Sequence, residues 1–273
     1  MTPRAQTDGT TAGPRFTFLG TGTSQGVPII GCDCPVCRSD DPRNRRLRSS
    51  LLVEDDDFRL LVDITPDFRT QALRAGFRRL DAIVITHPHV DHLFGLDDVR
   101  AFNDLQGEPI PLWGSAWTLE VIRDAFGYIF RDGPAGTTRP RLTLREIAGP
   151  WTLGPFQVTP LPVRHGPAEI YGFGIAARNG ARLVYIPDCN EIPEATFAQI
   201  GRPEVMILDA LRPAPHPTHF SLPQSLDALR RIAAPRSFIT HLTHRLEHAA
   251  TQAALPPGIF VPYDGWRETL TAN

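Results

Sequence analysis

Short apolar runs alternate with amphipathic stretches along most of this chain. Six runs have the length and residue types of buried or half-buried strands: Phe16–Leu19, Leu51–Val53, Leu60–Ile64, Ala82–Ile85, Phe156–Val163 and Val205–Leu208. The dipeptide Asn179-Gly180 is a strong signal for a two-residue hairpin turn. We therefore expect Tyr171–Ala177 to pair with Arg182–Ile186.

Helical spacing appears in five further segments: Pro66–Phe77, Asp91–Asp104, Ala116–Phe130, Glu191–Ile200 and Leu222–Ile232. Hairpins thus occur together with strand–helix alternation. This mixture predicts an α/β chain of mixed sheets covered by helices, rather than a purely parallel doubly wound sheet. The segment Arg131–Arg141 is rich in Gly, Pro, Thr and Arg and is expected to form the longest loop.

The 273 residues and 41% hydrophobic content suit a globular protein. We expect one domain over residues 15–273, preceded by a polar, disordered leader at 1–14. A net charge of -2 gives no long-range attraction to nucleic acid or membrane surfaces. No apolar run reaches the roughly 18 residues of a membrane span, and the leader lacks the features of a signal peptide. These observations predict a cytoplasmic protein with no membrane partner.

The densest chemical signal is the segment Thr86–His92, THPHVDH, directly after the apolar run Ala82–Ile85. His87 and His89 are two residues apart on an extended segment, so they point to the same side and can share one metal ion. Asp91 and His92 lie at the turn into the next helix and can reach a second ion. The alternatives are a solvated turn or a helix capped by Asp91, but neither requires three histidines.

Three of the four cysteines, Cys32, Cys34 and Cys37, fall within six positions. Such short spacings suit a metal better than disulfides. A group of reactive or redox thiols, and buried cysteines without a ligand role, are the alternatives. Cys189, beside Asp188, is expected to be structural.

Two other segments have more than one interpretation. Gly20-Thr21-Gly22 imitates a nucleotide-binding loop, but its glycine spacing is wrong for the dinucleotide fingerprint, so we expect a turn that lets the backbone approach the metal site. The arginines just after the cysteines could grip a phosphate or form a solvated surface paired with Asp40 and Asp41; they are Arg43, Arg45, Arg46 and Arg48. His216 and His248 are expected at the surface.

The H-x-H-x-D-H segment resembles the metal-binding signature of the metallo-β-lactamase superfamily. The resemblance implies a four-layer αββα sandwich whose metal site lies at the sheet edges. It also implies three more ligands, each at a strand end in this sequence. His165 would complete a first metal with His87 and His89, Asp188 would bridge both metals, and His241 would complete the second with Asp91 and His92. Asp63 resembles the family aspartate that supports the histidine loop from behind.

The stretch Leu19–Pro28, followed by Gly31–Cys37, resembles the branch that contains phosphoribosyl 1,2-cyclic phosphate phosphodiesterase. This resemblance implies a structural zinc held by Cys32, Cys34, Cys37 and His244. It also implies that His219 is a catalytic histidine that binds no metal and either protonates the leaving oxygen or stabilises charge on the phosphate. The alternative for His219 is an ordinary histidine of a surface loop.

The resemblance as a whole implies a hydrolase with two divalent ions, zinc or manganese, besides the structural zinc. Asp91 and His219 are the expected catalytic residues, and a cyclic phosphodiester of a small sugar or nucleotide is the expected substrate. Two alternatives stay open. One is a tRNA 3′-processing endonuclease, although no long basic insertion supplies an RNA-holding arm, and nucleic acid is not an expected partner. The other is a cofactor-pathway protein like pyrroloquinoline quinone synthesis protein B. A homodimer is an open expectation.

Overall fold

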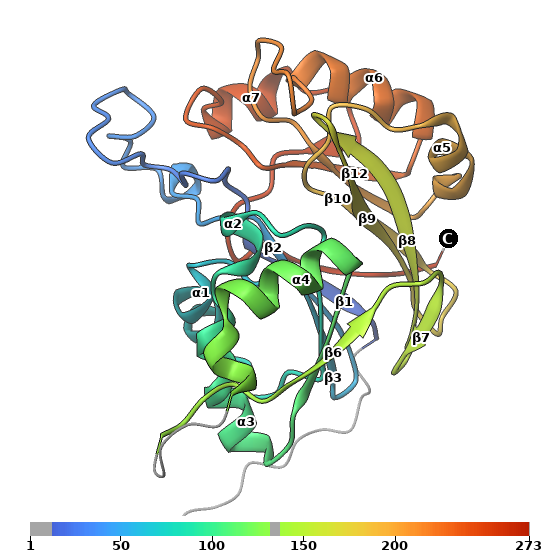
Figure 1. The fold of residues 1–273 in the computed structure, drawn as a ribbon. Helices are drawn as coiled ribbons and strands as arrows, with labels where there is room; N and C mark the ends of the chain where they lie inside the picture. The colour runs from blue at the N-terminus through green and yellow to red at the C-terminus, as the bar shows by residue number, and fades with distance from the viewer. Residues whose placement is uncertain (1–12, 132–136, 273) are drawn as a thin grey trace, which may run out of the picture.

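Two seven-stranded sheets form the centre of the protein in the computed structural model, which describes residues 13–131 and 137–272 (Figure 1). The first sheet has the order β14-β1-β2-β3-β4-β5-β6. Its strands are β1 (Arg15–Gly20), β2 (Ser50–Asp55), β3 (Phe58–Val62), β4 (Ala82–Val84), β5 (Ile110–Gly114), β6 (Leu142–Glu146) and β14 (Arg267–Thr269). Most of the leader expected at 1–14, and positions 132–136 of the expected long loop, lie outside the described residues.

The second sheet has the order β13-β12-β11-β10-β9-β8-β7. Its strands are β7 (Trp151–Leu153), β8 (Phe156–His165), β9 (Ala168–Ala176), β10 (Arg182–Ile186), β11 (Val205–Asp209), β12 (Arg236–Thr240) and β13 (Ile259–Phe260). The predicted hairpin is confirmed, because β9 and β10 pair antiparallel with Leu183 opposite Ile175. Strands β10 to β13 run parallel, so their carboxyl ends meet at one edge.

Helices cover the outer face of each sheet, which gives the four-layer αββα arrangement (Figure 1). Those on the first sheet are α1 (Phe68–Ala75), α2 (Val90–Leu93), α3 (Arg100–Gln106) and α4 (Ala116–Ala125). Those on the second are α5 (Glu194–Ile200), α6 (Leu222–Ile232) and α7 (His248–Ala254). The described residues also contain three short 3-10 helices, η1 (Pro42–Asn44), η2 (Leu96–Val99) and η3 (Gly127–Phe130). Within the described residues, no helix has the length and apolar character needed to cross a membrane.

The helix predicted over Asp91–Asp104 is divided into α2, η2 and α3. The division falls at Gly95, whose backbone lies so close to the neighbouring loop that a Cβ would stand 2.1 Å from the carbonyl oxygen of Thr65. The idea that Asp91 caps this helix is wrong. The N-cap residue is His89, and Asp91 is the second residue of α2.

Alternate residues of each central strand face different cores, which explains the continuous apolar runs of the sequence. In β10, Leu183 and Tyr185 belong to the core between the two sheets, whereas Val184 and Ile186 belong to the core beneath the helices of the second sheet. Phenylalanines fill much of the space between the sheets, among them Phe16, Phe18, Phe156, Phe173 and Phe238. The two sheets therefore hold their strand ends in a fixed mutual position.

Candidate metal centre

The segment that follows β4 turns at the edge of the first sheet and presents its histidines toward the second sheet. His87 Nε2 lies 2.9 Å from His89 Nδ1, so the two rings point to the same side. His165, at the end of β8, joins them, and one nitrogen of each ring falls within 4.8 Å of the others. Hydrogen bonds orient two of the rings: His87 Nδ1 lies 3.0 Å from Thr86 Oγ1, and His165 Nδ1 lies 2.7 Å from the carbonyl oxygen of Thr218.

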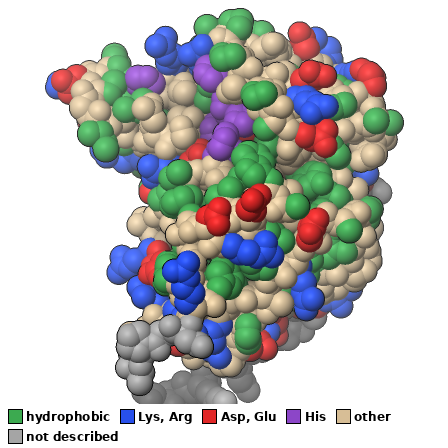
Figure 2. Space-filling view, in the orientation of Figure 1, with side chains coloured by type: hydrophobic (Ala, Val, Ile, Leu, Met, Phe, Trp, Pro, Cys, Tyr) green, Lys and Arg blue, Asp and Glu red, His purple; other side chains and the backbone are tan. Residues whose placement is uncertain are grey.

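A second group of possible ligands lies beside these three histidines. It contains Asp91, His92, Asp188 and His241, and one atom of each falls within 4.8 Å of the others. His92 Nε2 is 3.3 Å from both Asp91 Oδ2 and Asp188 Oδ1. All four side chains are buried. The segment between β1 and β2, residues 21–49, projects from the main body and is called the projecting lobe below (Figure 1). Histidine side chains gather in the hollow between this lobe and the main body (Figure 2).

Asp188, just after β10, stands between the two groups and offers a different oxygen to each. Its Oδ1 lies 3.3 Å from His92 Nε2 and 3.1 Å from His241 Nδ1. Its Oδ2 lies 3.9 Å from His87 Nε2. A carboxylate placed in this way can bridge two ions.

Asp63, which follows β3, holds the histidine segment from behind. Its carboxylate accepts a hydrogen bond from the Thr86 backbone N–H at 2.8 Å and lies 2.8 Å from His92 Nδ1. These contacts turn His92 Nε2 toward Asp91 and Asp188. Asp63 has a φ of 64°, a left-handed conformation that is uncommon outside glycine, so its position is imposed by the contacts around it.

Burial keeps most of the histidines in the neutral form that binds metal. It lowers the pKa of His87, His89 and His165, and it lowers the pKa of His241 to about 3. His92 differs: burial alone would lower its pKa, but the charges of Asp188, Asp91 and Asp63 raise it well above its usual value. Three buried carboxylates around one imidazole form a region of excess negative charge, which divalent cations would neutralise.

Buried polar atoms without hydrogen-bond partners also indicate a site for divalent cations. His92 Nε2, Asp188 Oδ1 and His241 Nδ1 have no hydrogen-bond partner among the described residues. Buried polar groups in proteins are nearly always satisfied, and all three atoms face one another in the second group. His241 also has a positive φ of 60°. The donor set of imidazole nitrogens and carboxylate oxygens thus fits divalent ions such as zinc or manganese.

His219 lies beside both ligand groups. With His165 and Asp188 it forms a further set in which one atom of each residue falls within 4.8 Å of the others, so its predicted role as a histidine that binds no metal stays a prediction. Its Nδ1 is 3.9 Å from Asp188 Oδ2, and its ring stacks on His241 at 4.9 Å between centroids. The same Nδ1 is 2.8 Å from Asp209 Oδ2. Burial lowers the pKa of His219, but the charge and hydrogen bond of Asp209 outweigh this and raise it to about 9.

Sequence reasoning missed Asp209. It is fully buried at the end of β11, where it also accepts a hydrogen bond from the Cys189 backbone N–H at 3.0 Å. A signal was present, because Asp209 directly ends the predicted strand Val205–Leu208. Asp63 and Asp188 occupy comparable positions, and a polar residue at the end of a buried strand is a candidate for function in such folds.

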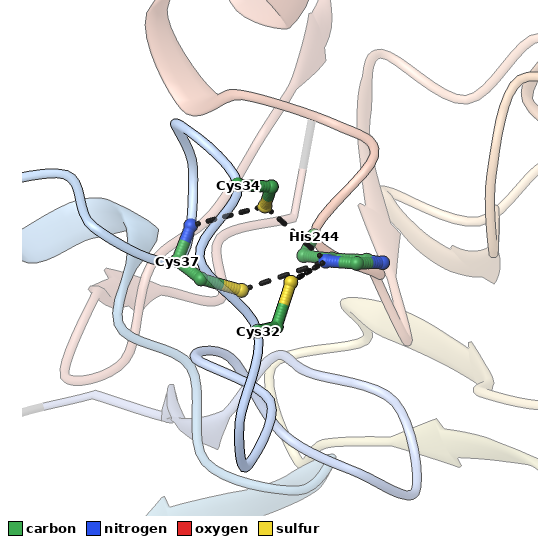
Figure 3. Close-up of side chains that lie close together, drawn as sticks. All are labelled: Cys32, Cys34, Cys37 and His244. Atoms are coloured by element: carbon green, nitrogen blue, oxygen red, sulfur yellow. Dashed lines mark hydrogen bonds between the residues drawn. The ribbon is translucent and has the colours of Figure 1, made fainter.

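The three clustered cysteines lie on the projecting lobe and face His244, which comes from the loop after β12 (Figures 1 and 3). The sulfurs of Cys32, Cys34 and Cys37 lie 3.3, 3.3 and 3.5 Å from His244 Nδ1. A tetrahedral zinc with bonds of about 2.3 Å to sulfur and about 2.0 Å to nitrogen places these atoms roughly 3.5 Å apart. The Cys37 backbone N–H donates to Cys34 Sγ at 3.4 Å and lowers the pKa of the Cys34 thiol to about 6. Both observations fit a zinc ion.

The arginine cluster does not act as one unit. Arg46 is buried and donates to Thr21 Oγ1 and to the Pro262 carbonyl oxygen, each at 2.7 Å. Arg48 pairs with Asp67 at 3.0 Å. Neither of the two predicted roles, phosphate grip or solvated surface, fits these two residues, since both fasten the loop to the body.

The glycine-rich stretch runs beside the metal centre. The Thr21 carbonyl oxygen accepts from the backbone N–H of Leu242, next to His241, at 3.0 Å. Gly20 is required for close packing, because a Cβ there would lie 1.9 Å from the Arg48 carbonyl oxygen.

The expectation that His248 is a surface residue is wrong. It is buried beneath the projecting lobe, with Nδ1 3.3 Å from an Arg46 guanidinium nitrogen. Its backbone N–H donates to Asn44 Oδ1 at 2.8 Å. Burial and the charge of Arg46 lower the pKa of His248 to about 4.

A model of the "Beta-lactamase superfamily domain" matches residues 58–242. The chain therefore belongs to the metallo-β-lactamase superfamily. It is similar to the crystal structure of a diphosphatase from the PhnP family, with 39% identity and a TM-score of 0.86 over 93% of this chain and 96% of that one.

Curated relatives carry three different names. An octanoyltransferase of Porphyromonas gingivalis is 36% identical over 92% of this chain and 50% of its own length. A ribonuclease Z of Bradyrhizobium diazoefficiens is 30% identical over 63% of this chain and 52% of its own. A coenzyme PQQ synthesis protein B of Methylobacterium nodulans is 30% identical over 70% and 71%. The chain spans about half the length of the first two relatives.

We predict that His248 makes folding stability depend on pH. Its pKa rises from about 4 in the folded protein to about 6.5 in the unfolded chain, so stability is complete above pH 7 and is lost as the pH falls from about 6.5 toward 4. Between pH 7.5 and pH 5 the native protein should lose about 2 kcal/mol from this residue alone. Urea unfolding of native and His248→Gln proteins at both pH values checks this. Equal losses in the two proteins would contradict it.

Proposed function

We propose that this protein is a phosphodiesterase with two divalent metal ions. His87, His89 and His165 would hold the first ion, and Asp91, His92 and His241 would hold the second, with Asp188 between them. The observation that supports this most directly is the placement of Asp188, whose two oxygens face different ligand groups.

Two bound ions would activate water near neutral pH and neutralise charge on the phosphoryl oxygens. Zinc and manganese both suit the mixed nitrogen and oxygen donors. The favoured substrate class is a cyclic phosphodiester of a small sugar or nucleotide. A PhnP-family diphosphatase and a ribonuclease among the similar proteins both support chemistry at phosphate.

His219 has the position and charge of a general acid. Asp209 holds its Nδ1 at 2.8 Å, which leaves Nε2 for a substrate oxygen. Because the buried carboxylate stabilises the imidazolium, the ring is protonated at neutral pH before the leaving oxygen departs. We assign His219 the role of proton donor to that oxygen and Asp209 the role of positioning His219.

Specific similarities support two other functions. The ribonuclease Z relative favours a tRNA 3′-processing endonuclease, and the PQQ synthesis protein B relative favours a cofactor-pathway protein. A proton donor beside a carboxylate that can bridge two ions is typical of a hydrolase. The site therefore favours a phosphodiesterase, whether it acts on small diesters or on RNA, over a cofactor-pathway protein. Turnover of small cyclic diesters, without cleavage of a precursor tRNA, separates the proposed function from both alternatives.

We also propose that Cys32, Cys34, Cys37 and His244 hold a structural zinc. Four ligands close a tetrahedral site and leave no open position for substrate. The ion would fasten the projecting lobe to the loop that carries His241, three residues before His244.

Replacing Asp188 with alanine should abolish the activity. Without the shared carboxylate the active-site ions bind weakly, and release of p-nitrophenol from bis(p-nitrophenyl) phosphate should fall by at least about 100-fold. Metal content measured by mass spectrometry should fall with it. Asp104→Ala, an exposed carboxylate on α3, is the matched control and should change neither quantity. Folded, metal-loaded native protein that releases no product would refute the phosphodiesterase proposal.

The loss of kcat caused by His219→Ala should depend on the leaving group of the ester. An alkyl phosphodiester, whose alkoxide needs a proton, should lose about 10²- to 10⁴-fold in kcat. A p-nitrophenyl ester should lose far less, because p-nitrophenolate departs without one. Asp209→Asn should give the same pattern with a smaller loss. Equal losses for both esters would show that these residues serve the structure of the site rather than proton transfer.

Cys37→Ser should remove one zinc ion per chain and lower the thermal midpoint by roughly 5 °C or more. The metal content of the hydrolytic centre should stay. Cys189→Ala removes a cysteine outside the lobe and should retain all the zinc. If the Cys37 variant keeps its full metal complement, the lobe is not a zinc site.

A further inference from the structure

A cavity of about 650 Å³ lies beside the projecting lobe, apart from the residues of the metal centre. Three segments that are distant in sequence form its wall. They contribute Pro42, Arg43, Arg45, Arg74, Tyr263 and Asp264. None of these residues belongs to the two active-site ligand groups or to the cysteine site. The cavity is therefore a separate feature of the surface.

The positive charge of the cavity wall is only partly neutralised by carboxylates. The guanidinium of Arg45 is exposed and has no hydrogen-bond or ion-pair partner in the part of the chain that the structure describes. Arg43 uses Nε and Nη2 on Asp41, at 3.0 and 2.7 Å. Its remaining nitrogen has no such contact. Two of the arginines thus present free N–H groups.

Arg74 is held in place but not neutralised by a dedicated partner. It donates to the Leu19 carbonyl oxygen and lies 3.4 Å from Asp264 Oδ2. The Asp264 carboxylate is already bound at shorter distances by Thr21 Oγ1 at 2.8 Å and by the Leu47 backbone N–H at 2.7 Å. Buried Arg46 adds a further positive charge behind the wall, where it binds the carbonyl oxygen that precedes Tyr263.

A larger cavity of about 1010 Å³ shows that arginines alone do not define such a site. There Arg178 lies 3.3 Å from Asp56, Arg79 lies 2.5 Å from Asp81, and Arg59 lies 3.3 Å from Glu54. Three of the four arginines in this wall thus have a carboxylate, and the fourth, Arg78, shares the wall with four aspartates, Asp55, Asp56, Asp57 and Asp81. The smaller cavity differs because its positive charge exceeds the local negative charge.

We propose that the cavity of Arg43, Arg45 and Arg74 binds the phosphate group of a small ligand. Arginine forks match phosphate oxygens in geometry and in charge, and the Tyr263 hydroxyl on the same wall can donate another hydrogen bond. The volume suits a phosphorylated metabolite. This inference rests on the cavity alone and does not require that the metal centre cut phosphodiesters.

A short chain of contacts joins the cavity to the metal centre. Asp264 accepts from Thr21 Oγ1, and the Thr21 carbonyl oxygen accepts from Leu242, the neighbour of His241. The phosphate could therefore belong to a distant part of the substrate or to a separate ligand. In either case the three arginines would bind the same group, a phosphate.

Equilibrium dialysis of radiolabelled inorganic phosphate against the metal-loaded protein tests the proposal. The native protein should show two classes of saturable binding, of which Asp188→Ala removes the one at the metal centre. Arg45→Gln should weaken the other class about tenfold or more, since it removes a charge-assisted hydrogen bond. Arg123→Gln, an exposed arginine on α4, should change neither class. Two unaltered classes in the Arg45 variant, or a single class that Asp188→Ala abolishes, would overturn the proposal.

Kinetics with two matched esters distinguish the sources. Thymidine 5′-(p-nitrophenyl phosphate) lacks a second phosphate, and its 3′-phosphorylated form carries one. A KM that Arg45→Gln raises only for the second ester assigns the cavity to the substrate. An unchanged KM for both esters, together with weakened phosphate binding, assigns it to a separate ligand. If the protein hydrolyses neither ester, the dialysis result still decides whether the cavity binds phosphate.

Discussion

The arrangement of the metal centre depends on the buried carboxylate of Asp63 and its contacts with the histidine segment. A buried charge is stable only when hydrogen bonds and opposite charge surround it, and Asp63 obtains both from Thr86 and His92. Burial raises its pKa, while His92 and the Thr86 N–H oppose that shift. The same contacts orient the ring of His92 and fix the start of the histidine segment. The position of Asp63 is set in turn by β3, whose residues are buried on both faces.

The geometry of the two sheets converts separate strands into one reactive centre. Parallel strands in each sheet end at the same edge, and the phenylalanine-rich core between the sheets keeps those edges together. Ligands therefore come from loops whose neighbours in sequence are core strands rather than mobile segments. The ligand side chains must be held at fixed distances. At the low dielectric of a buried site, small changes in these distances strongly alter the repulsion and attraction between carboxylates and imidazoles.

Much of this arrangement is readable in the sequence. The strands that pack on both faces appear as continuous apolar runs, and the ligands predicted from the family resemblance fall at their ends, where the structure brings them together. Short edge strands such as β7, β13 and β14 have too few residues to show a period, so the sequence does not predict them. The break at Gly95 depends on a contact with Thr65 that no local pattern records. The sequence does not show the buried roles of His248 and Arg46 for the same reason, since their partners lie far along the chain. Asp209 differs, because its place at the end of the strand Val205–Leu208 is a local signal.

The pairing of the cysteine lobe with His244 has a consequence for how the protein is made. The cysteines precede their histidine by more than 200 positions, and β1 completes its hydrogen bonding only with β14 near the other end of the chain. Contacts of such long range form late, because the loop between them must first be closed. During synthesis the histidine-rich segment emerges long before His241 and His244. Until then, the residues that complete the second ligand group and the cysteine site have not been made. The second ligand group is therefore complete only late in folding, when His241 joins Asp91, His92 and Asp188.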